Sequence, residues 1–195
     1  MRSVTVVLCL FLAPGVGHAA SVGGEFNVDG PGAQNCSLFV EAVDQADAAS
    51  LTAFSAWTEG FVTGVNVFRD ETYDVTPWQT PQLILSKMAA FCRENPDVPY
   101  VNGLGRLISV LMPNRQTEPS PIIQVRYDGQ AVALPTWVLN EARRALEAVT
   151  DGGALPTAPD GFDDAFAERL KSFQAAEGLP RTGLPDQATL NRLFP

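Results

Sequence analysis

The chain has almost no histidine, and this absence excludes several classes of enzyme. The only histidine is His18, which lies within the first twenty residues, a stretch with the features of a removable targeting segment. Without it, a Ser–His–Asp triad, a Cys–His pair and a histidine-ligated zinc site are all excluded. The acidic group Asp70, Glu71 and Asp74 lacks the alternating acids and central glycine of a calcium loop. We therefore expect no cofactor and no metal site.

Basic residues are also scarce. The 195-residue chain has 13 lysines and arginines against 22 acids, so its net charge is −9. Between residues 25 and 112, 11 acids face 4 bases, and this stretch alone carries −7. Such a chain lacks the basic surface that binding to nucleic acid or to an anionic membrane requires. Its acidity is compatible with a basic periplasmic protein as a partner, and also with a charge that only keeps an exported protein soluble.

Long hydrophobic runs are absent except at the N-terminus. Arg2 precedes an apolar run from Val4 to Ala13, and small residues end the segment at Ala19 and Ala20. Residues 1–20 therefore predict a signal peptide. About ten apolar residues are too few for a helix to cross roughly 30 Å of hydrocarbon, so we expect no membrane insertion after its removal. The predicted location is periplasmic or secreted.

Cysteine is rare as well, and only Cys36 and Cys92 follow the predicted signal peptide. An exported chain with two cysteines is expected to form one disulfide. Closing a loop of 56 residues would stabilise the fold by roughly 4 kcal/mol through the entropy of the unfolded chain. Two buried thiols are the alternative, whereas a catalytic cysteine has no histidine to activate it.

Hydrophobic periodicity predicts a mainly α fold that begins with a helical disulfide domain over residues 34–112. Thr80-Pro81 has the form of a helix start, and Asn95-Pro96 has the form of a helix stop. With one cysteine at the start of the first helix and the other near the end of the third, the disulfide would staple a four-helix unit. A core of about 80 residues is small, and a covalent link is a common way to stabilise one.

Residues 113–121 contain three prolines and no periodic apolar residue, which predicts a Pro-rich linker or a stiff turn. A second domain is expected over residues 122–195. It opens with a short β-hairpin around Asp128-Gly129, and three helical stripes follow. We expect Gly178 to end the second of these helices and Asp186 to cap the third.

Several short motifs near the C-terminus are spaced as in a known family. They are Leu170-Lys171-Ser172-Phe173-Gln174, Gly178-Leu179-Pro180, Thr182-Gly183, Asp186 and Thr189-Leu190. This series resembles the three-helix peptidoglycan-binding-like domain, most strongly from residue 160 onward. The resemblance implies a three-helix fold, peptidoglycan as the partner and a role in targeting to the cell wall. The chain departs from the family pattern at Asp163, Phe166 and Arg169.

Three residues of this stretch are the candidate ligand-binding residues. The amide of Gln174 donates and accepts hydrogen bonds, so it would hold the Thr182-Gly183 loop or bind a ligand amide. Arg181 and Thr182 lie on a turn that we expect to be exposed, where one of them would meet a stem-peptide carboxylate or a sugar amide. A solvated turn without a ligand is the alternative.

The helical domain has a weaker resemblance of its own. Segments 57–66 (WTEGFVTGVN) and 91–96 (FCRENP) are similar to small exported helical proteins with one disulfide. Two such groups are the HdeA-type acid-stress chaperones and the immunity proteins that block wall-cleaving amidase toxins. Gly60 and Gly64 lie one helical turn apart, which favours close packing of another helix, with a binding groove as the alternative.

Together these observations favour an exported, non-catalytic peptidoglycan-binding protein that anchors a small helical partner-binding domain at the cell wall. One alternative is a periplasmic stress chaperone, or an inhibitor or immunity protein of a wall-cleaving enzyme. Another is a wall hydrolase. Without histidine only a carboxylate mechanism survives for it, with Glu59 or Glu94 as the acid.

Overall fold

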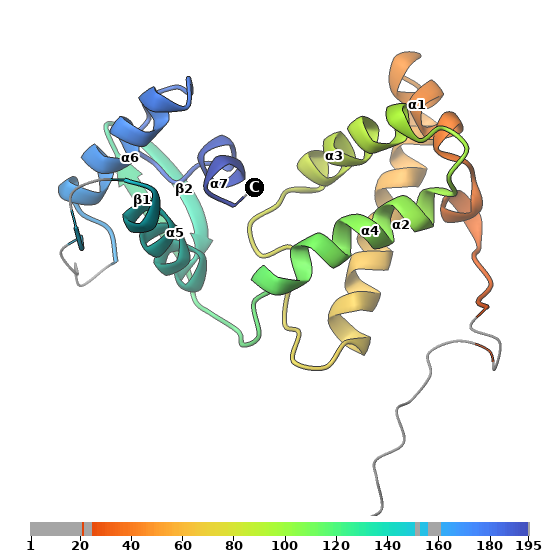
Figure 1. Cartoon of the computed structure of the whole chain (residues 1–195), viewed down its shortest axis with the longest axis horizontal. Helices are drawn as coiled ribbons and strands as arrows, with labels where there is room; N and C mark the ends of the chain where they lie inside the picture. The colour runs from red at the N-terminus through yellow and green to blue at the C-terminus, as the bar shows by residue number, and fades with distance from the viewer. Residues whose placement is uncertain (1–20, 22–24, 151–152, 156–160, 195) are drawn as a thin grey trace, which may run out of the picture.

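The computed structural model describes residues 21, 25–150, 153–155 and 161–194. The predicted signal peptide, residues 1–20, lies outside the described residues. The described chain forms seven α-helices and one two-stranded sheet around two hydrophobic cores (Figure 1). The expected mainly α architecture is confirmed, because a disulfide-stapled four-helix unit is followed by a hairpin and three further helices.

The N-terminal core is built from four α-helices and two short 3-10 turns. The elements are η1 (Gly30–Ala33), α1 (Cys36–Asp44), α2 (Ala48–Phe68), α3 (Pro81–Glu94), α4 (Tyr100–Leu111) and η2 (Met112–Asn114). We call this part of the chain the helical region. The expected start and stop of α3 are confirmed. The Thr80 hydroxyl accepts a hydrogen bond from the Leu83 amide at 3.2 Å, and Asn95-Pro96 follows the last helical residue.

Aromatic side chains fill the core of the helical region. The ring centroids of Phe39, Phe54 and Tyr100 lie 4.9, 5.0 and 4.8 Å apart, which is a favourable range for aromatic pairs. The buried Tyr100 hydroxyl shares a hydrogen bond of 2.9 Å with Thr58 Oγ1. Burial raises the pKa of Tyr100 to about 12, although the hydrogen bond to Thr58 acts against this shift. The phenol is therefore neutral at neutral pH.

The predicted disulfide between Cys36 and Cys92 is confirmed, with the two Cα atoms 4.8 Å apart. It joins the first residue of α1 to the C-terminal part of α3, and both cysteines are fully buried. The Cys36 amide also donates a hydrogen bond to the Val98 carbonyl at 2.9 Å. The covalent link therefore holds α1 against α3, and the backbone bond holds α1 against the segment that leads into α4.

The proline-rich segment 113–121 is held at both ends. Gln116 is buried and pairs with Asp74 in an isolated antiparallel bridge, where the Gln116 amide donates to the Asp74 carbonyl at 2.8 Å. At the other end, the Pro121 carbonyl accepts from the Thr136 amide at 2.8 Å. Of the two interpretations of this segment, these bonds favour the stiff turn.

The expected β-hairpin is confirmed, with β1 (Ile122–Tyr127) antiparallel to β2 (Gln130–Pro135). Its two turn residues, Asp128 and Gly129, have φ angles of 47° and 76°. Positive φ at both positions is the type I′ geometry that an Asp-Gly pair favours. Val125 of β1 is buried, so one face of the hairpin covers the second core.

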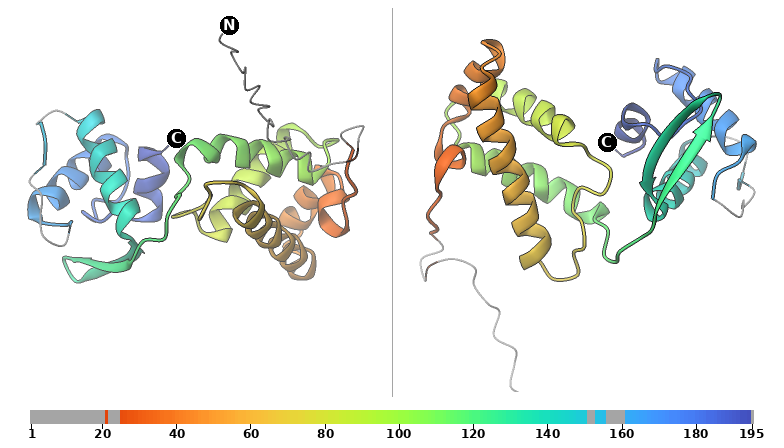
Figure 2. Two further views of the ribbon diagram at one scale, coloured as in Figure 1. Left: turned by 90° about the horizontal axis from the view of Figure 1, so that it is seen from below. Right: turned by 180° about the vertical axis from the view of Figure 1, so that it is seen from behind.

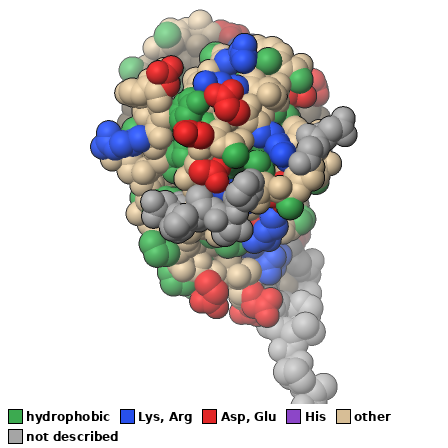
Figure 3. Space-filling view, turned by 90° about the vertical axis from the view of Figure 1, so that its left-hand side faces the viewer, with side chains coloured by type: hydrophobic (Ala, Val, Ile, Leu, Met, Phe, Trp, Pro, Cys, Tyr) green, Lys and Arg blue, Asp and Glu red, His purple; other side chains and the backbone are tan. Residues whose placement is uncertain are grey.

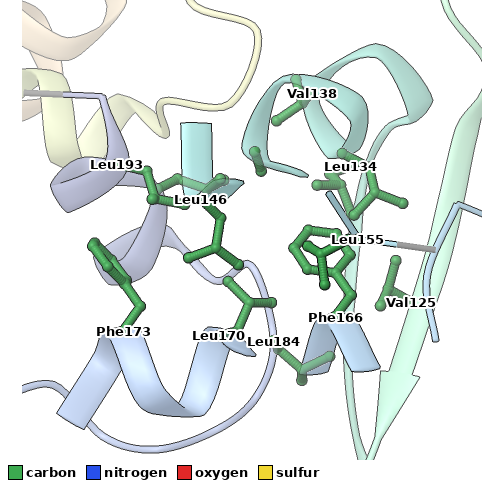
Figure 4. Close-up of a cluster of buried hydrophobic side chains, with 13 residues drawn as sticks. Val125, Leu134, Val138, Leu146, Leu155, Phe166, Leu170, Phe173, Leu184 and Leu193 are labelled. Atoms are coloured by element: carbon green, nitrogen blue, oxygen red, sulfur yellow. The ribbon is translucent and has the colours of Figure 1, made fainter. Parts of the chain in front are cut away.

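Three helices complete this second core, and we call the part from β1 onward the C-terminal region. They are α5 (Thr136–Val149), α6 (Asp164–Ala176) and α7 (Gln187–Leu193). In Figure 4, apolar side chains from these helices and from the hairpin converge on one interior. The expected cap of α7 is confirmed, since the Asp186 carboxylate accepts from the Thr189 amide at 2.9 Å.

The two cores meet where the loop before α3 contacts α7. Trp78 packs against the C-terminal core, and its ring centroid lies 5.8 Å from that of Phe194. The Gln187 amide binds the same loop twice, because its Nε2 donates to the Trp78 carbonyl at 3.0 Å and its Oε1 accepts from the Thr80 amide at 2.9 Å. Both views in Figure 2 show α7 on the side of its core that faces the helical region.

The close helix packing that we expected at Gly60 and Gly64 is not found. A Cβ atom built on either glycine would meet no atom within 4 Å. The spacing of two glycines allows a helix to approach, but no helix of the described chain does so.

Two further features concern membranes and metals. Among the described residues, no helix has the length and apolar character needed to cross a bilayer. Within the same residues, no group of three or more histidine, cysteine, aspartate or glutamate side chains is arranged to hold a metal ion.

Candidate functional site

The turn between α6 and α7 carries Arg181 and Thr182, two of the three candidate ligand-binding residues. After α6 ends, Gly178 adopts a φ of 68°, and the Leu179 amide donates to the Gln174 carbonyl at 2.8 Å. Glycine is favoured at such a left-handed position because other residues are strained there. The Thr182 amide then donates to the Pro180 carbonyl at 2.9 Å. Backbone hydrogen bonds alone therefore fix part of the turn.

Gln174 is fully buried on α6 and holds this turn from the inside. Its Oε1 accepts from the Gly183 amide at 2.9 Å. Its Nε2 lies 2.8 Å from Thr189 Oγ1, 2.9 Å from Thr182 Oγ1 and 3.0 Å from the Leu184 carbonyl oxygen. Because an amide nitrogen has two hydrogens, the three acceptors share them. The Gln174 side chain is thus engaged with the loop, and a ligand would reach it only if the turn opened.

Asp186 extends this network to α7. Its carboxylate accepts from the Thr182 hydroxyl at 2.7 Å and from the Thr189 hydroxyl at 2.8 Å. Each of these hydroxyls therefore donates to Asp186 and accepts from Gln174. A buried polar network whose members are all satisfied specifies a single local geometry. The turn is consequently preorganised.

Arg181 is the predicted ligand-binding residue that faces solvent. Thr182 is half-buried and its hydroxyl is used in the network, whereas the Arg181 side chain is exposed. The Arg181 guanidinium forms no hydrogen bond or ion pair with any described residue. The three predicted residues therefore lie close together, because Gln174 of α6 and Thr182 hold the backbone of the turn and Arg181 presents a cation.

Three side chains that we did not expect at a site lie beside this turn. The Tyr127 hydroxyl donates to Glu168 Oε1 at 2.8 Å, and Lys171 Nζ lies 3.1 Å from both the Tyr127 hydroxyl and Glu168 Oε1. Lys171 Nζ is also 4.6 Å from the centroid of the Tyr127 ring, within cation–π range. We call Tyr127, Glu168, Lys171 and Arg181 the Arg181 platform.

The charges of the platform act on one another. The pKa of Glu168 is lowered, first by the hydrogen bond from Tyr127 and then by Lys171, and the charge of Arg181 acts in the same direction. Hydrogen bonds to Tyr127 and Glu168 raise the pKa of Lys171. Two cations thus surround one carboxylate and leave a net positive site, which suits an anionic group of a ligand. Figure 3 views the C-terminal region from outside, with lysine and arginine side chains lying among acidic and hydrophobic ones.

Gly183 allows the turn to lie against the hairpin. Its φ is 69°, and a Cβ atom at this position would lie 3.0 Å from Tyr127 Cδ1 and 3.2 Å from Lys171 Cε. Both the backbone conformation and the close approach therefore require glycine. As a result, the turn, α6 and the hairpin form one continuous surface.

Sequence reasoning missed Tyr127, Glu168 and Lys171 as site residues. The last two have the i,i+3 spacing of a helical ion pair, which pairs them but does not indicate a site. No local signal points to Tyr127, because its bonds to α6 join residues 41 and 44 positions apart. Only the packing of the hairpin on α6 brings it to the turn.

The two carboxylates considered for a hydrolase lie on different helices of the helical region, and both are exposed. Glu59 accepts a hydrogen bond from the Ser55 hydroxyl at 2.9 Å, and Glu94 is the last residue of α3. The acid of a glycosidase usually lies in an enclosed apolar site that keeps it protonated. Neither side chain has such surroundings.

Comparison with known proteins identifies part of the C-terminal region. Residues 141–193, a little over a quarter of the chain, match the family model of the peptidoglycan binding domain. The match begins within α5 and covers α6, the turn and α7, whereas the hairpin and the helical region lie outside it. No curated protein and no solved structure matches the chain. The resemblance of the C-terminal motifs predicted this match, which is confined to residues 141–193.

Proposed function

We propose that this chain is an exported, non-catalytic protein that binds peptidoglycan through its C-terminal region and so holds its helical region at the cell wall. The observation that carries the proposal is the turn with Arg181. This turn lies within the family match, Gln174 supports it from inside, and the Arg181 guanidinium forms no hydrogen bond or ion pair with a described residue. A preorganised site loses little conformational entropy on binding.

The chemistry of the Arg181 platform favours a carboxylate as the group that is recognised. The stem peptides of peptidoglycan carry free carboxylates, and an arginine can bind one in a bidentate pair. Lys171 supplies a second cation beside Glu168, and the Tyr127 ring supplies an apolar face next to it. A sugar amide of the glycan strand is the other group of the wall that Arg181 can bind, since the Thr182 hydroxyl is already engaged by Gln174 and Asp186.

Export is part of the same proposal. Buried disulfides such as Cys36–Cys92 persist mainly in oxidising compartments outside the cytoplasm. The family match also supports a place at the cell wall. The signal peptide expected at residues 1–20 would bring the chain there, so the mature protein would be periplasmic or secreted.

The helical region would engage a protein partner at the wall. Its net charge of −7 over residues 25–112 favours, at long range, a partner that is basic overall. A stress chaperone or an inhibitor of a wall enzyme would use the same region without needing to bind the wall. Retention on peptidoglycan therefore separates the proposal from these alternatives.

Co-sedimentation of the full chain with purified peptidoglycan sacculi tests the proposal. We expect most of the chain in the pellet, and at least about tenfold weaker apparent affinity for Arg181→Ala over a series of sacculus concentrations, because one charge-assisted pair is worth about 1.5–3 kcal/mol. Sacculi from which an amidase has removed the stem peptides should retain little of the wild-type chain. The amount should match that of Arg181→Ala on untreated sacculi. Arg144→Ala is the matched control, since Arg144 is an exposed arginine of α5 that pairs with Glu141.

Two outcomes would contradict this account. A full chain that stays in the supernatant would exclude wall binding. Equal losses for Arg181→Ala and Arg144→Ala would show that net charge alone retains the chain, without a defined site at the turn.

A further inference from the structure

An open groove lies against helices α2 and α4 on the surface of the helical region. Figure 1 labels the two helices. The groove has two parts, of 520 and 640 Å³, which share Phe61. Its apolar lining includes Phe61, Val65 and Phe68 from α2. Val101 and Met112 line it from the side of α4. We call this surface the α2–α4 groove.

Two glycines leave room in the groove for another backbone. Gly64 lines it from α2 and Gly105 from α4, and a Cβ atom on either would meet no atom within 4 Å. At one end of the groove the Phe68 side chain is 85 % exposed. Contiguous apolar surface that stays open to water usually marks an interaction site. The groove is therefore unfilled space with an apolar face on the α2 side, whereas the α4 side adds Val101 and Gly105 among the polar side chains of Asn102, Arg106 and Ser109.

The groove is lined mainly by basic residues, whereas the helical region as a whole is acidic. Five basic residues lie between positions 25 and 115, and three of them, Arg69, Arg106 and Arg115, line the groove. Asp70 is the acid among the lining residues. Arg69 and Arg106 form no ion pair with a described residue, and Arg106 lies over the Phe91 ring at 5.7 Å. These two cations are free to pair with carboxylates.

We propose that the α2–α4 groove binds an amphipathic helix of a partner protein, whose apolar stripe lies between α2 and α4 and whose flanking carboxylates pair with Arg69 and Arg106. The lining face from Val101 to Met112 extends about 16 Å at 1.5 Å per residue, which is enough for three turns of a bound helix. Docking of a helix by its apolar face in a groove is a recurring mode of recognition.

This inference goes beyond wall binding and concerns the contact segment of the partner. The acidity of the whole region acts at long range and favours a partner that is basic overall. The arginines of the groove act at contact distance and favour carboxylates. The docking helix would thus be an acidic segment of its protein.

A second copy of this chain fits the groove poorly. A two-fold pairing brings the same surface of both copies together, so Arg69 and Arg106 of one copy would face those of the other. The net charge of −7 on each helical region would add repulsion between the copies. A separate partner with carboxylates avoids both costs.

Fluorescence anisotropy with two synthetic peptides tests the inference on the chain from Ser21 onward. Each peptide is a helix of about 15 residues with a leucine stripe, and the flanking positions carry glutamate in one peptide and lysine in the other. We expect the glutamate peptide to bind at least about tenfold more tightly, although the negative charge of the chain by itself attracts the lysine peptide. Equal or tighter binding of the lysine peptide, or no binding of either, would overturn the inference.

Filling the groove provides a matched pair of variants. Gly64→Leu places a side chain in the groove, whereas Gly60→Leu makes the same substitution one turn earlier on α2, outside the groove lining. Both replace glycine within a helix, so neither should weaken α2. We expect about tenfold weaker binding of the glutamate peptide to Gly64→Leu and unchanged binding to Gly60→Leu. Equal effects would contradict docking in the groove, as would a dimer in sedimentation that Gly64→Leu dissociates.

Charge reversal and a second substitution complete the test. Arg69→Glu combined with Arg106→Glu should reverse the preference between the peptides, and Lys87→Glu, a base outside the groove lining, should not. If Gly64→Leu fails to fold by circular dichroism, Phe68→Ser replaces it, because that side chain is 85 % exposed and contributes little to the core. Phe68→Ser is expected to weaken binding about tenfold, and unchanged binding would overturn the inference. Peptide binding needs no peptidoglycan, so its failure is distinct from failure of the proposed wall binding.

Discussion

In the helical region a buried disulfide joins α1 to α3, whereas in the C-terminal region a buried glutamine joins α6 to the turn before α7. Cys36 and Cys92 constrain the unfolded chain, which is where a disulfide has much of its effect. Gln174 acts in the folded state, where its amide satisfies buried groups of the turn and of α7. Two small helical cores of one chain thus reach stability by different physical means.

The two regions also differ at their surfaces. In the helical region an open groove lies against α2 and α4, and the disulfide joins neither of these helices. A hydrogen-bond network needs close packing to keep its geometry, so the turn with Arg181 lies tightly against Tyr127 and Lys171. One region therefore offers an apolar groove, and the other a rigid polar surface.

The largest effect is expected from removing the disulfide. The double variant Cys36→Ala with Cys92→Ala should lose about 4 kcal/mol of unfolding free energy, because the unfolded chain regains the entropy of a long loop. Hydrogen exchange should show that amides of α1 to α4 lose protection while those of α6 and α7 keep it. Reduction of the wild-type protein is the control and should give the same pattern. Equal loss of protection in both regions would show that they unfold as one unit.

A smaller effect is expected from the polar network. Gln174→Leu keeps the volume of the side chain but removes the bonds of Gln174 to the Gly183 amide and the Leu184 carbonyl, while two threonine hydroxyls keep only their bonds to Asp186. This loss should cost roughly 2–3 kcal/mol. Urea unfolding measures the loss, and exchange should increase in α6 and α7 only. Gln130→Leu is the control, because Gln130 is exposed at the start of β2. A variant as stable as the wild type would show that the network does not stabilise this core.

The smallest effect is expected at the contact between the regions. Gln187→Ala removes two hydrogen bonds to the loop before α3 and should lower stability by about 1 kcal/mol, since these groups remain accessible to water. Small-angle scattering should show a larger radius of gyration as the two cores separate. Gln45→Ala, which removes a bond to the Glu41 side chain within the helical region, should leave the radius unchanged. An unchanged radius for Gln187→Ala would mean that Trp78 alone holds the regions together.

Features that depend on near neighbours could be predicted from the sequence. Thr80-Pro81 starts α3, Asp128-Gly129 turns the hairpin and Asp186 caps α7, and each acts through bonds that span at most a few residues. The disulfide could be predicted from the number of cysteines in an exported chain. The motifs around Gln174 and Thr182 predicted the family of the C-terminal domain.

Features that depend on distant contacts could not be predicted in the same way. Gly60 and Gly64 predicted close packing of a helix, and this prediction was wrong, because their spacing determines how near a helix can come and not whether one is present. The sequence allowed Gln174 either to hold the turn or to bind a ligand amide, and only its burial against Gly183 distinguishes the two roles. Tyr127 carried no signal of a site, since only the fold brings the hairpin to α6.

The sequence by itself determined where helices end, where the hairpin turns, which cysteines pair and which family model residues 141–193 match. These properties follow from interactions between neighbours or from the inventory of side chains. Tertiary structure alone decided that Arg181 is exposed beside Lys171 while Gln174 is enclosed, and that α2 and α4 leave a groove bordered by arginines. Those outcomes depend on how helices far apart in the chain pack, and pairwise signals along the sequence do not specify such packing.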